Sequence, residues 1–590
     1  MSVRGLGGVI RALGVAVVAL GITGVGIARP ADPEPAAIDA IFSQWNAQTP
    51  GVALAIVRDE KIIYSRGYGM ANLDHAVPIA ANTVFDIGST SKQFTAACIL
   101  LLAEDGKLAI TDDVRKYIPE LPEYEKPITI AHLLHHTSGL RDYTALMLLA
   151  GLSIESDYSE AFLLDIIVRQ KGLNFAPGEQ FRYSNTGYFL LGEIVRRVSG
   201  IPMSRFAKAR IFEPLGMSST IFSDDHLAIV PHRAESYYPR EDGAGPPGFQ
   251  LSISLMDNVG DGGIYTTVED LAKWDANFYH NKLVVGGAGK SEFLDQMQKV
   301  GLLDNGQPIG YASGLFIGAH RGQRMVSHSG GWRGFRAEMV RFPDLKLSVI
   351  CLANIGTAQS TELALRVADL YLPEGPDGSA DNPPARAATT MGRAAPSAAP
   401  TLAIPDGDWN KFLGRYKADS GGGGGPIWTV TRSGDELAIV STSGLTFAAR
   451  PIGALEFEST NRPQLARLVF RTDDTGNIAS ITQTIADMPA VRLTPIEAMT
   501  DPAAGLSDFG GVYDSDELGA SVTASVSDGQ LWFAGAGEPA PYPLSRYAPN
   551  GFSVWGFEAV FTRGSDGTVD GFIMNAPPAS GMRYLKRAPR

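Results

Sequence analysis

The chain has 590 residues, of which 44% are hydrophobic and 19% are charged. This length exceeds what one hydrophobic core usually holds, so we expect several domains, and the composition excludes a wholly disordered chain. The formal net charge is −13 and no basic cluster lies beyond the extreme N-terminus, which argues against nucleic-acid binding because an acidic surface repels phosphates.

Residues 1–28 have the pattern of an export signal. Arg4 and Arg11 precede an uncharged apolar run over 12–28, which ends in small residues suited to cleavage. A membrane anchor is the alternative, but the run is shorter than the about 20 residues that span a bilayer comfortably. We therefore predict a cleaved signal peptide, a periplasmic or secreted protein and no stable membrane anchor.

The region 37–372 mixes strand and helix patterns. Alternating apolar and polar residues predict a hairpin over 51–70, and strand patterns return over 326–354. Helices are predicted from about Thr90 to Glu104 and over 160–171, 187–199 and 267–281. Strands at both ends with helices between them predict an α+β fold with one antiparallel sheet flanked by helices.

The two cysteines, Cys98 and Cys351, each lie in an apolar run. An oxidising compartment would permit a bridge between them. One distant pair is not a disulfide framework, so we interpret both as small buried hydrophobic residues.

The remainder of the chain begins with a segment rich in Pro, Ala, Gly and Ser, 373–405, which we interpret as a linker because it can bury little. Beyond it, short alternating strands separated by turn residues predict a sandwich or barrel. This tail repeats itself, since FLGRY at 412–416 is similar to FGGVY at 509–513. We therefore predict two small antiparallel β-barrel modules, over 406–498 and 502–590.

The strongest chemical signal is the run from Gly88 to Lys92, GSTSK, which opens the first long predicted helix. Residues three apart share a helix face, so the Lys92 amine can approach the Ser89 hydroxyl. A serine hydroxyl is a poor nucleophile until a base takes its proton, and a partly desolvated lysine can be that base. The helix N-terminus adds N–H groups that favour an oxyanion. Alone, such a pair occurs by chance about once in a chain of this length.

Two further motifs follow in order, YSN at 183–185 and HSGG at 328–331. Together the three resemble the serine β-lactamase and penicillin-binding-protein superfamily, most closely its class C-like branch of serine hydrolases. The resemblance covers about residues 37–372 and includes supporting blocks such as FDIGSTSKQFTA, ITIAHLLHHTSGL and GDGGIYTTVEDLAKW. It implies a β-lactamase/transpeptidase-like fold and acyl transfer through a serine.

The resemblance also implies roles for the motif residues. Ser89 would attack the scissile carbonyl, and Lys92 and Tyr183 together would act as general base. A phenol needs nearby cations to act as a base near pH 7, and Lys92 and a protonated His328 are the candidates. Asn185 would orient Lys92 and bind a substrate amide. The backbone N–H groups of Ser89 and Gly331 would form the oxyanion hole. Further substrate contacts are expected from Ser329, Gly330 and Trp332.

One position departs from the β-lactamase pattern, because His328 stands where most β-lactamases carry Lys. Histidine titrates near neutrality, so the site would lose positive charge as the pH rises. Superfamily members with His here are mainly peptidases acting on D-residues, which lowers our expectation of efficient β-lactam hydrolysis.

Several other residues are interpreted as structural. The spacing of His132, His135 and His136 could hold a metal on a helix, but their block matches a structural segment of the superfamily, so we predict no metal or cofactor. Trp274 lies in an apolar helical stripe and is expected in the core. Asp261 is expected to serve a turn, with a charged substrate group as its alternative partner.

The layout of a catalytic domain followed by two small barrels is similar to that of the superfamily's D-aminopeptidases, in which a barrel loop reaches the cleft. Here the acidic segment 514–520 could pair with an amine, but we expect a turn in solvent. Four functions stay open: a D-stereospecific peptidase (D-aminopeptidase or D-Ala-D-Ala carboxypeptidase), an esterase, a β-lactamase and a slowly acylating penicillin-binding scaffold. We favour the peptidase, with a small peptide or ester substrate that could derive from peptidoglycan.

Overall fold

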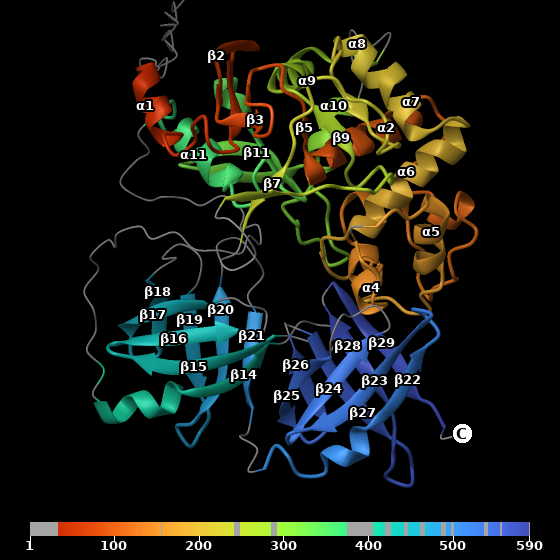
Figure 1. The fold of residues 1–590 in the computed structure, drawn as a ribbon, viewed down its shortest axis with the longest axis vertical. Coiled ribbons are helices and arrows are strands. Elements are labelled where there is room, and N and C mark those ends of the chain that lie inside the picture. The colour runs from red at the N-terminus through yellow and green to blue at the C-terminus, as the bar shows by residue number, and fades with distance from the viewer. Residues whose placement is uncertain are drawn as a thin grey trace, which may run out of the picture.

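The protein is described from a computed structural model (Figure 1). The structure describes residues 33–373 except 155, 241–247 and 285–291, and residues 404 and 406–588 except eight short segments. Those segments are 419–425, 442–445, 461–466, 485–490, 497–500, 536–540, 555–556 and 577. The predicted signal at 1–28 and nearly all of the predicted linker therefore lie outside the described residues. Within the described residues, no helix has both the length and the apolar character needed to cross a membrane.

A six-stranded antiparallel sheet forms the centre of the first domain. Its strands are β1 (Val52–Arg58), β2 (Lys61–Tyr68), β10 (Phe316–His320), β11 (Gln323–Trp332), β12 (Phe335–Phe342) and β13 (Leu347–Ala353), in the order β10-β11-β12-β13-β1-β2. The predicted hairpin is the β1–β2 pair, and the later strand patterns are β11 to β13. Because β1 pairs with β13, the two ends of this domain meet in the middle of the sheet.

Helices cover both faces of the sheet (Figure 1). Along β1, Ala53 and Ala55 join one buried cluster while Leu54 and Ile56 join the other, because side chains alternate between the faces of a strand. Burial on both faces explains why this strand is apolar throughout. One face is covered by α1 (Pro35–Ile41) and α11 (Ser360–Asp369). The other face joins a core that it shares with the remaining helices, of which α9 packs on β1, β2 and β13.

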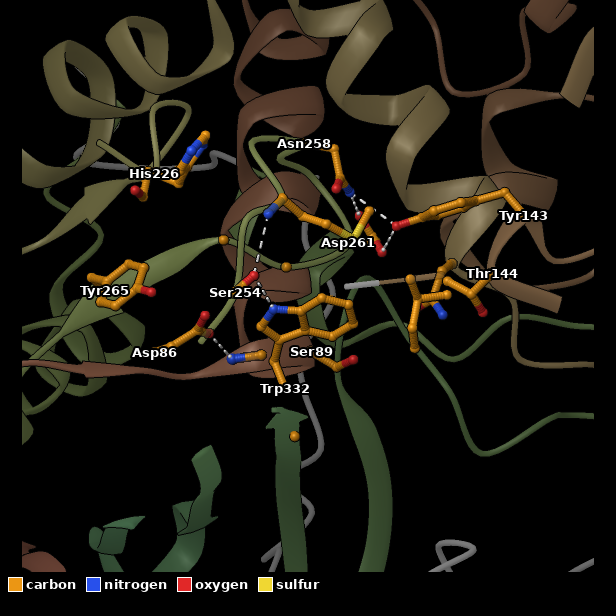
Figure 2. Close-up of a pocket in the computed structure, with 18 of the residues that line it drawn as sticks. Asp86, Ser89, Tyr143, Thr144, His226, Ser254, Asn258, Asp261, Tyr265 and Trp332 are labelled. Atoms are coloured by element: carbon orange, nitrogen blue, oxygen red, sulfur yellow. Dashed lines mark hydrogen bonds between the residues drawn. The ribbon is translucent and has the colours of Figure 1, made fainter. Parts of the chain in front are cut away.

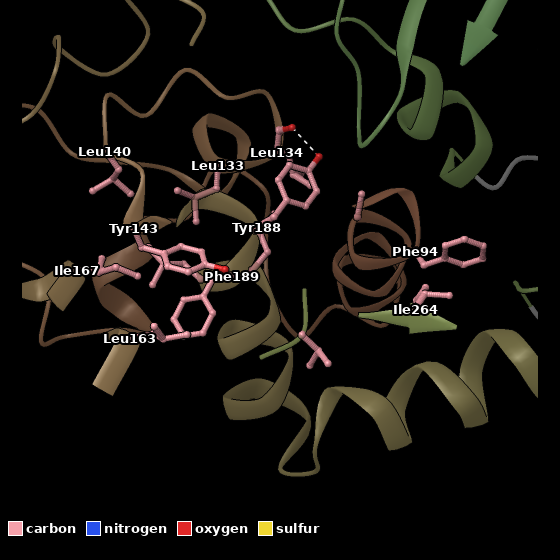
Figure 3. Packing of buried hydrophobic residues seen from close by; sticks show 14 of the residues in the cluster. Phe94, Leu133, Leu134, Leu140, Tyr143, Leu163, Ile167, Tyr188, Phe189 and Ile264 are labelled. Atoms are coloured by element: carbon pink, nitrogen blue, oxygen red, sulfur yellow. Dashed lines mark hydrogen bonds between the residues drawn. The ribbon is translucent and has the colours of Figure 1, made fainter. Parts of the chain in front are cut away.

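Those remaining helices are α2 (Lys92–Glu104), α3 (Ile130–Leu134), α4 (Tyr143–Leu149), α5 (Glu160–Val168), α6 (Asn185–Ser199), α7 (Met203–Ala207), α8 (Glu213–Leu215), α9 (Val268–His280) and α10 (Phe293–Gln298). The four helices expected from sequence are α2, α5, α6 and α9. The Thr267 side chain caps α9 by accepting from the Asp270 N–H at 3.1 Å, and Trp274 is fully buried in the core as expected. Figure 3 shows Phe94 of α2 and Tyr188 and Phe189 of α6 within this core.

Short strands form three small separate sheets between these helices, and β5 leads into the turn before α2. They are β3 (Met70–Asn72), β4 (Val77–Pro78), β5 (Phe85–Asp86), β6 (Ile221–Phe222), β7 (Tyr237–Pro239), β8 (Phe249–Leu251) and β9 (Ile264–Thr266). Cys98 and Cys351 are both free and buried, which confirms their interpretation as separate core residues.

Two closed eight-stranded barrels follow, which confirms the predicted duplication. The first consists of β14 (Gly414–Ala418), β15 (Ile427–Ser433), β16 (Glu436–Ser441), β17 (Thr446–Gly453), β18 (Glu456–Ser459), β19 (Arg467–Thr472), β20 (Ile478–Thr484) and β21 (Val491–Ile496). The second consists of β22 (Gly511–Ser515), β23 (Ala520–Ser527), β24 (Gln530–Gly535), β25 (Tyr542–Ala548), β26 (Gly551–Val554), β27 (Phe557–Arg563), β28 (Val569–Ala576) and β29 (Ala579–Lys586). The repeated motif makes the same bond in both, from Tyr416 Oη to the Phe412 carbonyl and from Tyr513 Oη to the Phe509 carbonyl, at 3.0 and 2.7 Å.

The second barrel docks on the first domain beside α4 (Figure 1). Arg141 is buried between them, where its guanidinium donates to the Glu517 carboxylate at 2.5 Å and to the Ser580 carbonyl at 2.8 Å. Asn174 donates to the Pro578 carbonyl at 2.8 Å and accepts from the Ser580 N–H at 2.9 Å. The expectation of a solvent-exposed acidic turn at 514–520 is therefore wrong for Glu517, because a buried guanidinium recruits its carboxylate into the interface.

Candidate active site

Ser89 lies in a single turn of 3-10 helix, Gly88–Ser91, which leads directly into α2. The strands β5 and β9 pair just before this turn. Gly88 has a φ of 49°, and a Cβ built on it would lie 2.6 Å from the Gly331 amide nitrogen of β11. The absence of a side chain at Gly88 thus lets the serine turn approach β11 closely.

Lys92 is completely buried and its amine has three oxygen neighbours. Its Nζ lies 3.1 Å from Ser89 Oγ, 2.9 Å from Asn185 Oδ1 and 2.6 Å from the Asp261 carbonyl oxygen. A neutral amine can donate to the last two oxygens and direct its lone pair at the serine hydroxyl. The geometry is therefore that of a general base within hydrogen-bond reach of a nucleophile.

The backbone of Asn185 is fixed by Asp142, a residue that was not predicted from the sequence as part of the site. The Asp142 carboxylate accepts from the Asn185 N–H at 2.5 Å and from the Thr144 N–H at 3.0 Å, so it joins the first turns of α6 and α4. Thr186 strengthens this junction by donating to the Arg141 carbonyl at 2.7 Å. Asp142 in front of an apolar helix is a recognisable N-cap signal, but its link to Asn185 depends on the tertiary fold.

Tyr183 lies beside this group without bonding to it. The Lys92 Nζ is 5.0 Å from the centroid of the Tyr183 ring, so the amine faces the ring. The buried Tyr183 hydroxyl forms no hydrogen bond with a described residue. Only Lys92 of the two predicted base residues therefore contacts Ser89 in this structure.

Two of the three histidines of AHLLHHTSG, His132 and His136, accept hydrogen bonds from the backbone. His132 Nδ1 accepts from the Thr129 N–H at 3.1 Å, within a capping box of α3. The His136 ring packs at a tilt against Tyr183, with ring centroids 4.2 Å apart, and its Nδ1 accepts from the Ser184 N–H at 3.2 Å. Burial lowers the pKa of all three and brings that of His135 to about 4. His136 thus supports the Tyr183–Asn185 loop, a role that the spacing alone did not indicate.

His328 is buried in β11 and its bonded partner is another aromatic residue. Its Nε2 lies 3.0 Å from the Tyr311 hydroxyl, and its Nδ1 lies 2.7 Å from the Ser329 carbonyl oxygen. A carbonyl only accepts, so Nδ1 carries the proton. Tyr311, which packs against His136, Tyr183 and Phe316, connects His328 to the rest of the aromatic group.

The other residues of the third motif divide between the cavity and the packed interior. Gly331 and Trp332 line the same cavity as Ser89, and the Trp332 Nε1 donates to Ser254 Oγ at 2.7 Å. Ser329 and Gly330 do not line it. Gly330 instead packs on the serine turn, where a Cβ would lie 1.7 Å from the Ile87 carbonyl oxygen.

This packing leads to a stability prediction for two adjacent glycines. Gly330→Ala is expected to lower the free energy of unfolding by about 2–3 kcal/mol, because the backbone of Ile87 must move to admit the methyl group. Gly331→Ala is the matched control. Its Cβ would meet the nearest atom of Arg336 at 3.5 Å, an ordinary contact, so a change of less than about 1 kcal/mol is expected. Urea unfolding of both variants measures the difference, and equal midpoints would contradict it.

The cavity has a volume of about 210 Å³ and Ser89, Asn185 and Gly331 all line it. Figure 2 shows Asp86 and Tyr265 on one side of Ser89 and Tyr143 and Thr144 on the other. Asp261, expected to serve a turn with a substrate group as its alternative partner, lines the cavity too, and its side chain accepts from the Tyr143 hydroxyl at 2.9 Å. All described lining residues belong to the first domain.

The chain is similar in sequence to proteins of known families. The family model described as Beta-lactamase matches residues 38–372. Penicillin-binding protein 4* of Bacillus subtilis (strain 168) is 32% identical over 307 residues, which are 50% of this chain and 65% of that relative's length. The segment matched by the family model coincides with the first domain.

Other relatives match over most of the chain. D-aminopeptidases of Gluconobacter oxydans (strain 621H) and Cereibacter sphaeroides (strain KD131 / KCTC 12085) are 26% and 27% identical, over 84% and 88% of this chain and 85% and 89% of theirs. The octameric penicillin-binding protein homologue from Pyrococcus abyssi has a similar structure, with a TM-score of 0.52 and 22% identity over 78% of this chain and 99% of that one. At that identity the structural likeness supports the fold alone.

Proposed function

This chain belongs to the beta-lactamase family, as a serine hydrolase with that fold, and we propose that it is an exported peptidase for peptides that contain D-amino acids. Cleavage would proceed through an acyl-enzyme on Ser89. The observation that carries the proposal is the contact at 3.1 Å between the buried Lys92 amine and Oγ of Ser89, which lines a cavity of about 210 Å³. The preference for D-residues draws on the D-aminopeptidases, whose similarity includes both the first domain and most of the tail.

The proposed reaction follows from the contacts of Lys92. The neutral amine, held by Asn185 and the Asp261 carbonyl, takes the Ser89 proton as Oγ attacks the substrate carbonyl. The backbone N–H groups of Ser89 and Gly331 stabilise the resulting oxyanion. The ammonium of Lys92 then returns the proton to the leaving amine, which departs and leaves the acyl group on Ser89. Water attacks this ester in the same manner and releases the acid.

A panel of four chromogenic or chromatographic assays tests the proposal. The substrates are D-Ala p-nitroanilide, a D-Ala-D-Ala tripeptide, p-nitrophenyl butyrate and a chromogenic cephalosporin. The highest kcat/KM is expected on one of the two D-amino-acid substrates, with L-Ala p-nitroanilide cleaved at least tenfold more slowly. Faster turnover of the butyrate ester or of the cephalosporin would instead identify an esterase or a β-lactamase.

A penicillin-binding scaffold is the second candidate, because a penicillin-binding protein is 32% identical over half of the chain. A scaffold would form a stable penicillin adduct on Ser89 and hydrolyse none of the four substrates. Intact-mass spectrometry with benzylpenicillin, run beside the assays, distinguishes the two functions.

Export to the periplasm or medium is proposed from Arg4, Arg11 and the apolar run at 12–28. The N-terminal sequence of the protein recovered from the periplasm tests it. A mature chain that begins shortly after residue 28 is expected, whereas an intact N-terminus in the cytoplasm would contradict export.

A further inference from the structure

The active-site cavity contains two aspartates, Asp86 and Asp261, whose surroundings differ. Asp261 has partners for both carboxylate oxygens, since Oδ2 accepts from the Tyr143 hydroxyl at 2.9 Å and Oδ1 from Asn258 Nδ2 at 3.1 Å. Its backbone carbonyl also accepts from Lys92. The Asp261 carboxylate is therefore fully hydrogen-bonded within the protein and needs no ligand to satisfy it.

Asp86 lines the same cavity but lacks comparable partners. It lies at the end of β5, three residues before Ser89, and only 3% of its surface is exposed. Its Oδ1 accepts from the Gly88 N–H at 2.7 Å. Among the described residues, no lysine, arginine or histidine forms an ion pair with it, and no side chain donates a hydrogen bond to it.

An aromatic residue and an arginine form part of the cavity wall around Asp86. Its cross-strand neighbour on β9 is Tyr265, which also lines the cavity. Arg233 also lines the cavity, but its guanidinium lies over the Tyr265 ring at 6.0 Å from the centroid, and the described residues show no ion pair between it and Asp86. Figure 2 shows Asp86 and Tyr265 together at one side of the cavity.

A buried carboxylate in this position is costly to the protein unless a cation or a proton joins it. Burial raises the pKa of Asp86 to about 7, opposed only by the hydrogen bond from Gly88. A cationic ligand placed beside this buried carboxylate would stabilise the ionised form and gain a charge-assisted hydrogen bond.

We propose that Asp86 is a specificity-determining residue that binds a primary ammonium group on the acyl portion of the substrate. The inference rests on the proposed hydrolysis at Ser89, and it identifies the substrate class as cationic. Two sources share this chemistry, the α-ammonium of an N-terminal residue and the side-chain ammonium of a basic residue. No described barrel residue lines the cavity, so the first domain itself supplies the carboxylate.

Pairs of substrates that differ in one amine test the proposal. D-Ala p-nitroanilide is paired with propionyl p-nitroanilide, and Nα-acetyl-D-lysine p-nitroanilide with its D-norleucine analogue. In the Asp86→Asn variant, the ratio of kcat/KM within at least one pair is expected to shift against the amine by about 10- to 100-fold. The pair that shifts identifies the source of the ammonium. Unchanged ratios in both pairs would overturn the proposal.

The matched control is Asp74→Asn, which removes the same charge from an exposed loop residue and is expected to leave both ratios as in the wild type. A shift of equal size in this control would attribute the effect to overall charge and also overturn the proposal. If Asp86→Asn does not fold, Asp86→Glu replaces it, with a smaller shift expected because the carboxylate is displaced by one methylene.

A binding measurement separates this inference from the proposed function. D-alanine amide and propionamide are titrated calorimetrically into the Ser89→Ala protein, which requires no turnover. At least tenfold tighter binding of the amine is expected, and Asp86→Asn in the same background is expected to remove this difference. Equal affinities would overturn the role of Asp86 even if hydrolysis is observed. Preferential amine binding without any Ser89-dependent hydrolysis would instead refute the proposed function and leave Asp86 as an ammonium site.

Discussion

Replacement of Ser89 by alanine is expected to lower kcat/KM on the best substrate by about 10⁴-fold or more, because no other group can form the acyl-enzyme. The fold should be retained, since the hydrogen bond that Ser89 Oγ makes with described residues is the one to Lys92 at 3.1 Å. Steady-state kinetics and the thermal midpoint of the purified variant measure the two effects.

Ser43→Ala provides the control for this experiment. The Ser43 hydroxyl donates to the Ala40 carbonyl at 3.0 Å next to α1, outside the residues that line the cavity, so the same chemical change should leave kcat/KM near its wild-type value. Activity of Ser89→Ala within tenfold of the wild type would refute Ser89 as the nucleophile. As an independent check, an acylating inhibitor should give no mass adduct on the Ser89→Ala protein.

Replacement of Lys92 by methionine is expected to reduce kcat by about 10²–10⁴-fold, which is the usual contribution of a general base. Methionine has similar length and no charge, so it fills the buried site without accepting a proton. KM is expected to change much less than kcat, since Lys92 does not line the cavity and acts on Ser89 rather than on the substrate. Pre-steady-state kinetics should show that acylation is the step that slows.

A paired variant distinguishes the base from a merely structural lysine. Lys92→Ala leaves a buried space beside Ser89, and added methylamine is expected to restore part of the lost activity in a concentration-dependent manner. Methanol is a much weaker base than methylamine and should restore no activity. Full activity in Lys92→Met, or equal rescue by both additives, would contradict the assignment.

Much of the first domain follows from local patterns in the sequence. The strand pattern over 51–70 predicted the β1–β2 hairpin, although β1 is apolar throughout because both of its faces are buried. The helical patterns predicted α2, α5, α6 and α9. The tail was predicted as duplicated barrels because its two copies retain the same turn and core residues. The docking of the second barrel was not predicted. It depends on groups such as Arg141 and Glu517, which lie 376 residues apart and carry no periodic signal.

Some residues of the site could likewise be predicted from local motifs, whereas others are recognised only in the folded structure. The motif residues Ser89, Lys92 and Asn185 meet, since short motifs specify them and two of them share a helical turn. Asp142 and Asp86 were missed as site residues, because their importance comes from which groups surround them after folding. For Asp86 the decisive feature is that it is buried at the cavity without an ion pair to any described residue, which no pattern of adjacent residues can reveal.

The hydrophobic side chains of the second barrel belong to the same continuous core as those of the first domain, whereas the first barrel has a core of its own. Heating should therefore melt the first domain and the second barrel in one cooperative transition, with the first barrel free to melt separately in a calorimetric scan. A recombinant fragment that stops after residue 372 would expose the apolar surface that the second barrel covers, so we expect this fragment to aggregate. Deletion of the first barrel, with the second rejoined by a linker, is the truncation that the architecture permits.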